Sequence, residues 1–314
     1  MAEEKKAAPA KKAKSTVAVK SAPKSSAKAK KEAVLAKVKA VERIGNKVVL
    51  NGYFRAEYGT YRILRRNIQK GCNTLLIGPT GTGKTELVDN LAKALGTKVT
   101  VFDMGTMSDP IMGLVGTHVI TVKEGKTTSE FKKSRFSDVI QEEGIVLLDE
   151  ISRASAAANN LLFPVLDFRR ELSMEYSFED NTPIKIHPKC VFFATANMGS
   201  QYTGTHKLDR ALIDRFMTVE VDQMGTSDTK DALKAAYPNI AKGTLDKIVD
   251  IYVKINKEHA DFKIGFNLSM RHLKTIAALV GDRFTIYDAY YTLIKGLGGK
   301  EGLKAIESIL KAGK

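Results

Sequence analysis

The feature that most constrains this chain is a glycine-rich loop between a strand pattern and a helical pattern. Residues 74–77 read Thr-Leu-Leu-Ile, residues 78–85 read Gly-Pro-Thr-Gly-Thr-Gly-Lys-Thr, and residues 86–95 have amphipathic helical periodicity. This is the G-x-x-x-x-G-K-[ST] pattern in the strand–loop–helix context that it requires. The glycines let successive N–H groups point at phosphate oxygens, and the following helix adds its positive N-terminal end. A glycine-rich turn that binds nothing is the alternative, and the flanking context disfavours it.

The loop also predicts what it binds. Lys84 is expected to reach the β- and γ-phosphates of ATP, and the Thr85 hydroxyl is expected to ligate Mg²⁺. The candidate nucleotide-binding residues are Gly78, Pro79, Thr80, Gly81, Thr82, Gly83, Lys84, Thr85 and Glu86.

Five short apolar runs alternate with helical segments, at residues 74–77, 99–102, 145–148, 191–194 and 217–221. Because the runs are continuously apolar and do not alternate with polar residues, they indicate strands covered on both faces. The expected fold class is α/β: a P-loop NTPase with a five-stranded parallel sheet flanked by helices. Ahead of the sheet we expect a short helix through Val34, Leu35, Val38 and Val41, then a helix from Tyr53 to Gln69 that Gly71 ends.

The chain divides into three parts. Residues 1–31 carry ten lysines against Glu3 and Glu4, a balance of +8 that leaves +7 of the net +15 for the rest. Their few apolar residues predict a disordered tail, which is either an arm for nucleic acid or a solvated segment. Residues 32–223 form the expected nucleotide-binding core. Residues 224–314 show only helical periodicity and predict a small all-helical lid domain.

Polar residues end two of the apolar runs. Asp149 and Glu150 follow the run at 145–148, and Asn197 ends the segment Ala-Thr-Ala-Asn after the run at 191–194. Groups at the carboxyl ends of parallel strands collect at one edge of the sheet. We expect Asp149 to hold Mg²⁺ and Glu150 to activate the attacking water. The alternatives are an acidic cap on the next helix and, for Asn197, an ordinary turn residue.

Two arginines precede the last strand. The segment 208–216 reads Leu-Asp-Arg-Ala-Leu-Ile-Asp-Arg-Phe, with Arg210 and Arg215 far from the phosphate loop in the sequence. A surface arginine usually forms a solvated ion pair, but one that reaches a neighbouring subunit's nucleotide stabilises transition-state charge.

Several classes of protein are disfavoured. No apolar run approaches the roughly 20 residues of a membrane-spanning helix, and no secretory signal pattern begins the chain. Cys72 and Cys190 lack zinc-like spacing, and five scattered histidines give no metal motif. We expect reduced, buried thiols in a cytoplasmic protein without a membrane partner.

These motifs in this order resemble an AAA+ ATPase. The segments Ile-Val-Leu-Leu-Asp-Glu, Phe-Phe-Ala-Thr-Ala-Asn and Ala-Leu-Ile-Asp-Arg-Phe carry the resemblance, which covers about residues 50–300. Residues 149–154 (Asp-Glu-Ile-Ser-Arg-Ala), 159–162 and 167–171 look like the MoxR branch, within the dynein-related type. Residues 122–132, His187-Pro188 and 202–205 look closer still to CobS, the small subunit of cobaltochelatase.

The resemblance implies further roles. Asn197 occupies the first sensor position, Arg271 in Ser-Met-Arg matches the second sensor, and Arg215 is favoured over Arg210 as the arginine finger. The role of Arg153 stays open. Residues 117–132, with Gly125-Lys126 at the turn, would form a β-hairpin near a central pore. Relatives form rings, commonly hexamers, and often work beside a partner with a von Willebrand-A-type domain.

The leading hypothesis is therefore an Mg²⁺-dependent ATPase that forms a homo-oligomeric ring and remodels or activates a partner protein. A nucleic-acid motor or loader that uses the basic N-terminal arm is one alternative. The ATPase subunit of a cobalt chelatase is another, although the chelating subunits it needs are not visible in this chain.

Overall fold

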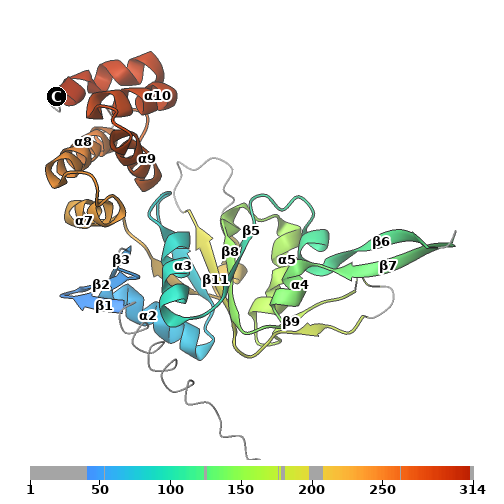
Figure 1. The fold of residues 1–314 in the computed structure, drawn as a ribbon. Coiled ribbons are helices and arrows are strands. Elements are labelled where there is room, and N and C mark those ends of the chain that lie inside the picture. Colours follow the sequence, from blue (N-terminus) through green and yellow to red (C-terminus); the bar gives the residue numbers. More distant parts are fainter. Residues whose placement is uncertain are drawn as a thin grey trace, which may run out of the picture. The chain divides into compact units, whose positions relative to one another are not determined.

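The computed structural model describes residues 41–52, 54–123, 126–175, 177, 181–197, 208–261 and 263–311. The expected tail at 1–31, the helical pattern through Val34 to Val38, Gly125 at the hairpin turn and the segment 202–205 lie outside the described residues. The remaining elements are shown in Figure 1.

The centre of the fold is a five-stranded sheet with the order β12-β4-β11-β8-β5. Every neighbouring pair in this sheet is parallel. The α/β fold with a five-stranded parallel sheet is thus confirmed. Its strands are β4 (Thr74–Ile77), β5 (Val99–Asp103), β8 (Gly144–Asp149), β11 (Cys190–Ala196) and β12 (Met217–Glu220).

Both faces of the sheet are buried, as the continuous apolar runs predict. In β8, Val146 and Leu148 belong to one hydrophobic cluster, whereas Ile145 and Leu147 belong to another. Successive strand residues point to opposite faces, so the inner strands β4, β8 and β11 each supply residues to both clusters. One face is covered by α2 (Tyr58–Lys70) and α3 (Lys84–Leu95), the other by α4 (Arg135–Val139) and α5 (Ala156–Leu166) (Figure 1).

The segment before the sheet differs from the expectation. The strands β1 (Val41–Ile44), β2 (Lys47–Leu50) and β3 (Phe54–Glu57) form an antiparallel sheet, and α2 begins only at Tyr58. The predicted helix start at Tyr53 is therefore wrong, and Val41 lies in a strand. The Asn51-Gly52 pair, with φ of 54° and 81°, turns the chain so that Phe54 pairs with Leu50. An Asn-Gly pair between apolar runs is a strong hairpin signal. The predicted helix end is confirmed, because Gly71 is left-handed with φ 66°.

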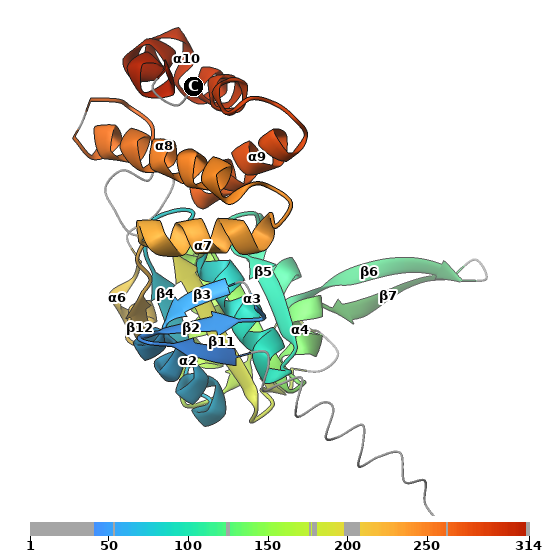
Figure 2. The same cartoon turned by 60° about the vertical axis from the view of Figure 1, so that its left-hand side comes forward.

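A long hairpin extends from the edge beside β5. The strands β6 (Gly116–Lys123) and β7 (Lys126–Lys133) pair antiparallel along their whole length, as the resemblance implied. Figures 1 and 2 both show the hairpin projecting away from the sheet. The short elements around it are the π-helix η1 (Ile111–Val115), the 3-10 helix η2 (Ile151–Arg153), the strands β9 (Glu171–Leu172) and β10 (Ile184–Lys185), and the helix α6 (Arg210–Ile213).

After β12 every described element is a helix. These are α7 (Thr226–Ala236), α8 (Lys242–Ala260), α9 (Met270–Gly281) and α10 (Ile286–Lys311), the last interrupted at Gly299. Their inward residues, among them Ile248, Leu273 and Tyr290, form a third hydrophobic cluster. A C-terminal helical region is thus present, while the division at residue 223 stays a prediction. Among the described residues no helix is long and apolar enough to cross a membrane.

Candidate functional site

One pocket of about 540 Å³ contains most of the residues that the sequence predicts. The predicted residues reach it from the loop after β4 and the start of α3, from the ends of β8 and β11, and from the start of α9. The predicted residues that line it are Thr80, Gly81, Thr82, Gly83, Lys84, Thr85, Glu86, Asp149, Glu150, Asn197 and Arg271. Gly78 and Pro79 do not line it, but their carbonyl groups face Lys84.

The glycines of the loop are required by its geometry. Gly81 and Gly83 have φ of 80° and 85°, in the left-handed region that glycine adopts without strain. A Cβ on Gly78 would lie 2.2 Å from the carbonyl oxygen of Val221, which follows β12. The close approach of two backbone segments therefore excludes any larger residue at position 78. The helix α3 begins at Lys84, so its N-terminal end faces the loop.

The Lys84 ammonium sits inside the loop. It donates to the carbonyl oxygens of Gly78 at 3.0 Å and Pro79 at 2.8 Å, and to Oδ1 of Asn197 at 2.8 Å. Burial lowers the pKa of Lys84 to about 8, although the nearby carboxylates of Asp149 and Glu150 act to raise it. Asn197 thus does more than end a strand, because its amide fixes the Lys84 side chain.

The Thr85 hydroxyl and the Asp149 carboxylate meet at the edge of the sheet. Thr85 Oγ1 donates to Asp149 Oδ1 at 2.8 Å, and Thr195 Oγ1 donates to the same oxygen at 2.5 Å. Hydroxyl and carboxylate oxygens are the ligands that Mg²⁺ prefers. The residues present therefore fit this ion. No sequence signal pointed to this role for Thr195, which depends on β11 lying beside β8 in the sheet.

Glu150 is held by two contacts. Its backbone N–H donates to Thr195 Oγ1 at 3.0 Å, and its carboxylate Oε2 lies 3.1 Å from Nε of Arg153. Glu150 has a left-handed backbone with φ 54°, which is uncommon for a residue other than glycine and occurs often at functional sites. Its side chain makes no capping hydrogen bond to η2, so the alternative of a helix cap finds no support.

The C-terminal helical region closes the other side of the pocket. Ser269 and Arg271 line it from the start of α9, and a Cβ on Gly81 would lie 2.7 Å from Cβ of Ser269. The Lys274 ammonium bonds both carboxylate oxygens of Glu86, at 3.0 and 3.2 Å. Glu86, a predicted nucleotide contact, therefore also ties α3 to α9.

The pocket continues into an apolar part that the sequence analysis missed. Phe54, Met224, Leu233, Tyr252 and Met270 line it. An apolar cleft beside a phosphate loop has the chemistry to hold a planar base. The residues come from β3, the segment after β12, α7, α8 and α9, so their meeting depends on tertiary packing.

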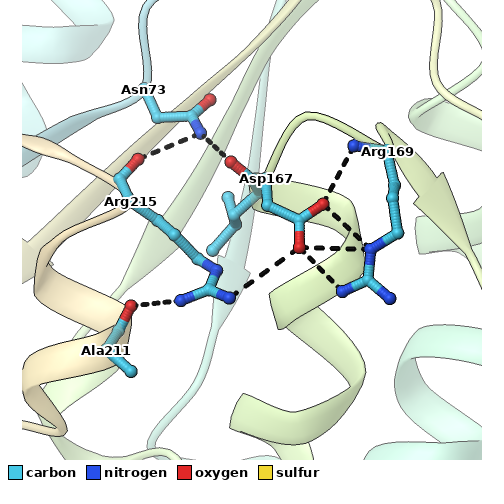
Figure 3. A network of polar contacts seen from close by, with 6 residues as sticks. Asn73, Asp167, Arg169, Ala211 and Arg215 are labelled. Atoms are coloured by element: carbon cyan, nitrogen blue, oxygen red, sulfur yellow. Dashed lines mark hydrogen bonds and ion pairs between the residues drawn. The ribbon is translucent and has the colours of Figure 1, made fainter.

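Arg215 lies away from this pocket. Its Nη2 is 3.8 Å from the Asp167 carboxylate, and its Nη1 donates to the carbonyl oxygen of Ala211 (Figure 3). Its guanidinium also lies 4.5 Å from the ring centre of Phe163. Asn73 Nδ2 bridges the backbone by donating to the carbonyl groups of Leu166 and Arg215. This chain therefore does not bring Arg215 to its own nucleotide pocket. Arg210 is exposed at the start of α6.

Comparison with known proteins agrees with this geometry. A family model described as "AAA domain (dynein-related subfamily)" matches residues 73–216. "Putative chaperone BssE" of Thauera aromatica is 29% identical over 221 residues, 70% of this chain and 73% of that protein. A Staphylococcus aureus (strain USA300) protein is 30% identical over 186 residues, 59% of this chain and 67% of its own length. Midasin of Dictyostelium discoideum is 30% identical over 199 residues, 63% of this chain but 3% of midasin.

The phosphate loop, the acid pair at the end of β8 and the parallel sheet define a P-loop nucleotide-binding protein. The chain belongs to the AAA+ ATPases, in the dynein-related subfamily.

Proposed function

We propose that this ATPase uses Mg²⁺ at the pocket between the phosphate loop and α9, works as a ring, and remodels or activates a partner protein. The observation that carries the proposal is the meeting of Lys84, Thr85, Asp149, Glu150 and Asn197 around one cavity. The finer resemblance to the MoxR and CobS branch rests on the sequence motifs alone.

Each group has a role in this proposal. Thr85 and Asp149 would hold Mg²⁺, which when bound would supply positive charge to offset the charge that develops on the phosphate oxygens. Lys84 and Arg271 bind the β- and γ-phosphates. Glu150 accepts a proton from the water whose oxygen attacks the γ-phosphorus, while ADP departs as the leaving group. Arg153 Nε lies 3.1 Å from Oε2 of Glu150, so this ion pair orients the carboxylate at the wall of the pocket.

The ring part of the proposal rests on Arg215 and the residue next to its partner Asp167. Phe168 is 93% exposed, which is unusual for an aromatic side chain of this size. Exposed aromatic residues often anchor protein–protein interfaces. We propose that a second copy of the chain packs against the surface around Phe168. Arg215 of one subunit would then contact the nucleotide bound by the next.

The client part rests on the β6–β7 hairpin. Ile120 and Val122 on β6 are each 70% exposed. Lys132 on β7 is exposed as well. Apolar side chains on a projecting hairpin suit transient contact with another protein. The relative BssE is described as a "putative chaperone", which is consistent with such a client. A von Willebrand-A-type partner stays an expectation from the resemblance.

The test is the variant Glu150→Gln in the full chain. We expect it to bind ATP in the presence of Mg²⁺ and to lose at least about 100-fold in turnover, as loss of a general base does. Glu143→Gln is the matched control, because Glu143 is an exposed acid paired with Lys189. Normal turnover in Glu150→Gln would reject the mechanism. Since the variant should stay ATP-bound, proteins captured by it and not by Glu143→Gln are the candidate clients.

A further inference from the structure

A second cavity of about 500 Å³ lies between β1 and α2, and the proposed ATPase reaction uses none of its residues. Four arginines line it, Arg43 from β1 and Arg62, Arg65 and Arg66 from α2. The other lining residues are Val41, Val48, Tyr58, Tyr61 and Gln69. We call this cavity the arginine groove.

The helix α2 places its arginines on one face. Residues three, four and seven apart lie on the same side of an α-helix, so Arg62, Arg65, Arg66 and Gln69 form a single exposed row. Leu64 lies on the opposite side and is buried in the core, whereas the buried Tyr61 forms part of the floor of the groove. At about 1.5 Å per residue, the row is roughly 10 Å long.

The positive charge of the groove is not neutralised by the part of the chain that the structure describes. There, none of the four arginines forms an ion pair with a carboxylate. The hydrogen-bond partners they do have are uncharged groups. Arg43 Nε donates to the carbonyl oxygen of Gly45, and Arg66 Nη1 donates to Oδ1 of Asn67 and to Sγ of Cys72. Like charges this close repel one another, so a bound anion would stabilise the arrangement.

Tyr58 fixes the arginine on the sheet side of the groove. The Arg43 guanidinium lies 3.8 Å from the centre of the Tyr58 ring, and that of Arg62 lies 5.7 Å from it. Such cation–π contacts orient a guanidinium without neutralising it. They also occupy the ring, which leaves Tyr58 unsuited to stacking on a base.

From these observations we infer that the arginine groove binds the phosphate backbone of a nucleic-acid strand. A guanidinium presents a planar fork that matches phosphate oxygens. Phosphates along a strand of B-form DNA are spaced about 3.4 Å apart along the axis, so a row of about 10 Å spans about three of them. A repeating polyanion fits this row better than one isolated phosphate. Because the contacts are to phosphate, binding is independent of base sequence.

The experiment uses the full chain and a labelled oligothymidylate, with affinity measured by fluorescence anisotropy over a range of salt concentrations. The test variant is Arg62→Ala/Arg65→Ala, which leaves the Arg66–Asn67 hydrogen bond intact. The control is Lys247→Ala/Lys254→Ala, which removes the same charge from an exposed face of α8. The lysine-rich segment 1–31 is present in both variants, so its contribution cancels. Equal melting temperatures establish that both variants are folded.

A plot of log K against log salt has a negative slope, and we expect the arginine variant to make it shallower by about 1.4. This is about 0.7 for each of the two phosphates of a single strand that no longer meet an arginine. The lysine control should change the slope by less than half as much. Equal changes in the two variants would overturn the proposal. Single-stranded RNA and duplex DNA, tested in parallel, identify which strand the groove prefers. If polyglutamate at the same charge concentration competes as well as oligothymidylate, the groove recognises acidic protein and the nucleic-acid assignment is wrong.

Discussion

Asp167 and Arg215 form an ion pair, with Nη2 of Arg215 3.8 Å from the Asp167 carboxylate. Hydrogen bonds from Arg169 hold the pKa of Asp167 below its ordinary value, and Arg215 adds to this shift, so Asp167 stays charged at neutral pH. The Arg215 guanidinium is thus oriented by an ion pair within its own chain, without a neighbouring subunit. In the ring that we propose, this contact would set the direction from which Arg215 approaches a neighbouring nucleotide.

The first prediction concerns Arg215→Ala. If Arg215 acts on a neighbouring nucleotide, the variant should bind ATP normally and lose turnover by a factor of about 10³ or more. Binding is measured with a fluorescent ATP analogue and turnover by phosphate release. Arg210→Ala, an exposed arginine on the same short segment, should keep most of its turnover. Normal hydrolysis in Arg215→Ala would remove this residue from the role of finger.

The second prediction concerns Phe168, beside that ion pair. Phe168→Ser removes a large exposed aromatic group without disturbing the core, because the side chain is 93% exposed. We expect the melting temperature of the monomer to be unchanged. The ATP-dependent oligomer should be weaker, so that it dissociates at a higher protein concentration than the unmodified oligomer does. Analytical ultracentrifugation with ATP and Mg²⁺ measures this. Phe284→Ser, at an aromatic residue that is 50% exposed after α9, is the control. An unaltered oligomer in Phe168→Ser would place the subunit contact elsewhere.

The third prediction concerns the backbone contact between the phosphate loop and the segment after β12. In Gly78→Ala the new methyl group would lie 2.2 Å from the carbonyl oxygen of Val221, so the loop must move. We expect a loss of about 1–3 kcal/mol in the free energy of unfolding, together with loss of ATP binding. Gly243→Ala is the matched control, because nothing lies within 4 Å of its added Cβ. Denaturant titration measures the change in stability, and an ATP-binding assay measures the loss of affinity. A Gly78→Ala variant that binds ATP normally would contradict the loop geometry.

The fourth prediction uses the pKa of Cys190. Burial raises it to about 11, so at pH 8 almost none of this thiol is ionised. Iodoacetamide should therefore label Cys72, which is half-buried and not fully buried as expected, and should spare Cys190 until the chain is denatured. Mass spectrometry of the labelled peptides is the readout, and equal labelling of both thiols in the native protein would contradict it.

The same shift sets a pH dependence of stability. An unfolded chain ionises a cysteine near its ordinary pKa, whereas the folded chain keeps the Cys190 proton up to about pH 11. The folded state thus binds more protons between these values, and its stability should fall as the pH rises through this window. A Cys190→Ala variant should lose this part of the pH dependence.

The local sequence predicts much of the core because its signals act over short distances. The apolar runs predict the five strands, and the glycine pattern at 78–85 predicts the loop with its left-handed Gly81 and Gly83. The rule that strand ends meet at one edge predicts that Asp149 and Asn197 lie near Lys84. Helix propensity alone failed at residues 54–57, because pairing with β2 outweighed it.

By itself, the sequence determined the class of fold and the phosphate-binding groups, since these depend on periodicity and on fixed spacing along the chain. Only the tertiary structure decided which apolar residues, such as Phe54 and Tyr252, share a cleft with the loop, and that Arg43 faces the arginines of α2. It also decided that Asp167 holds Arg215. These residues are separated by whole elements, and their contact follows from packing of helices on sheets, which no local pattern encodes.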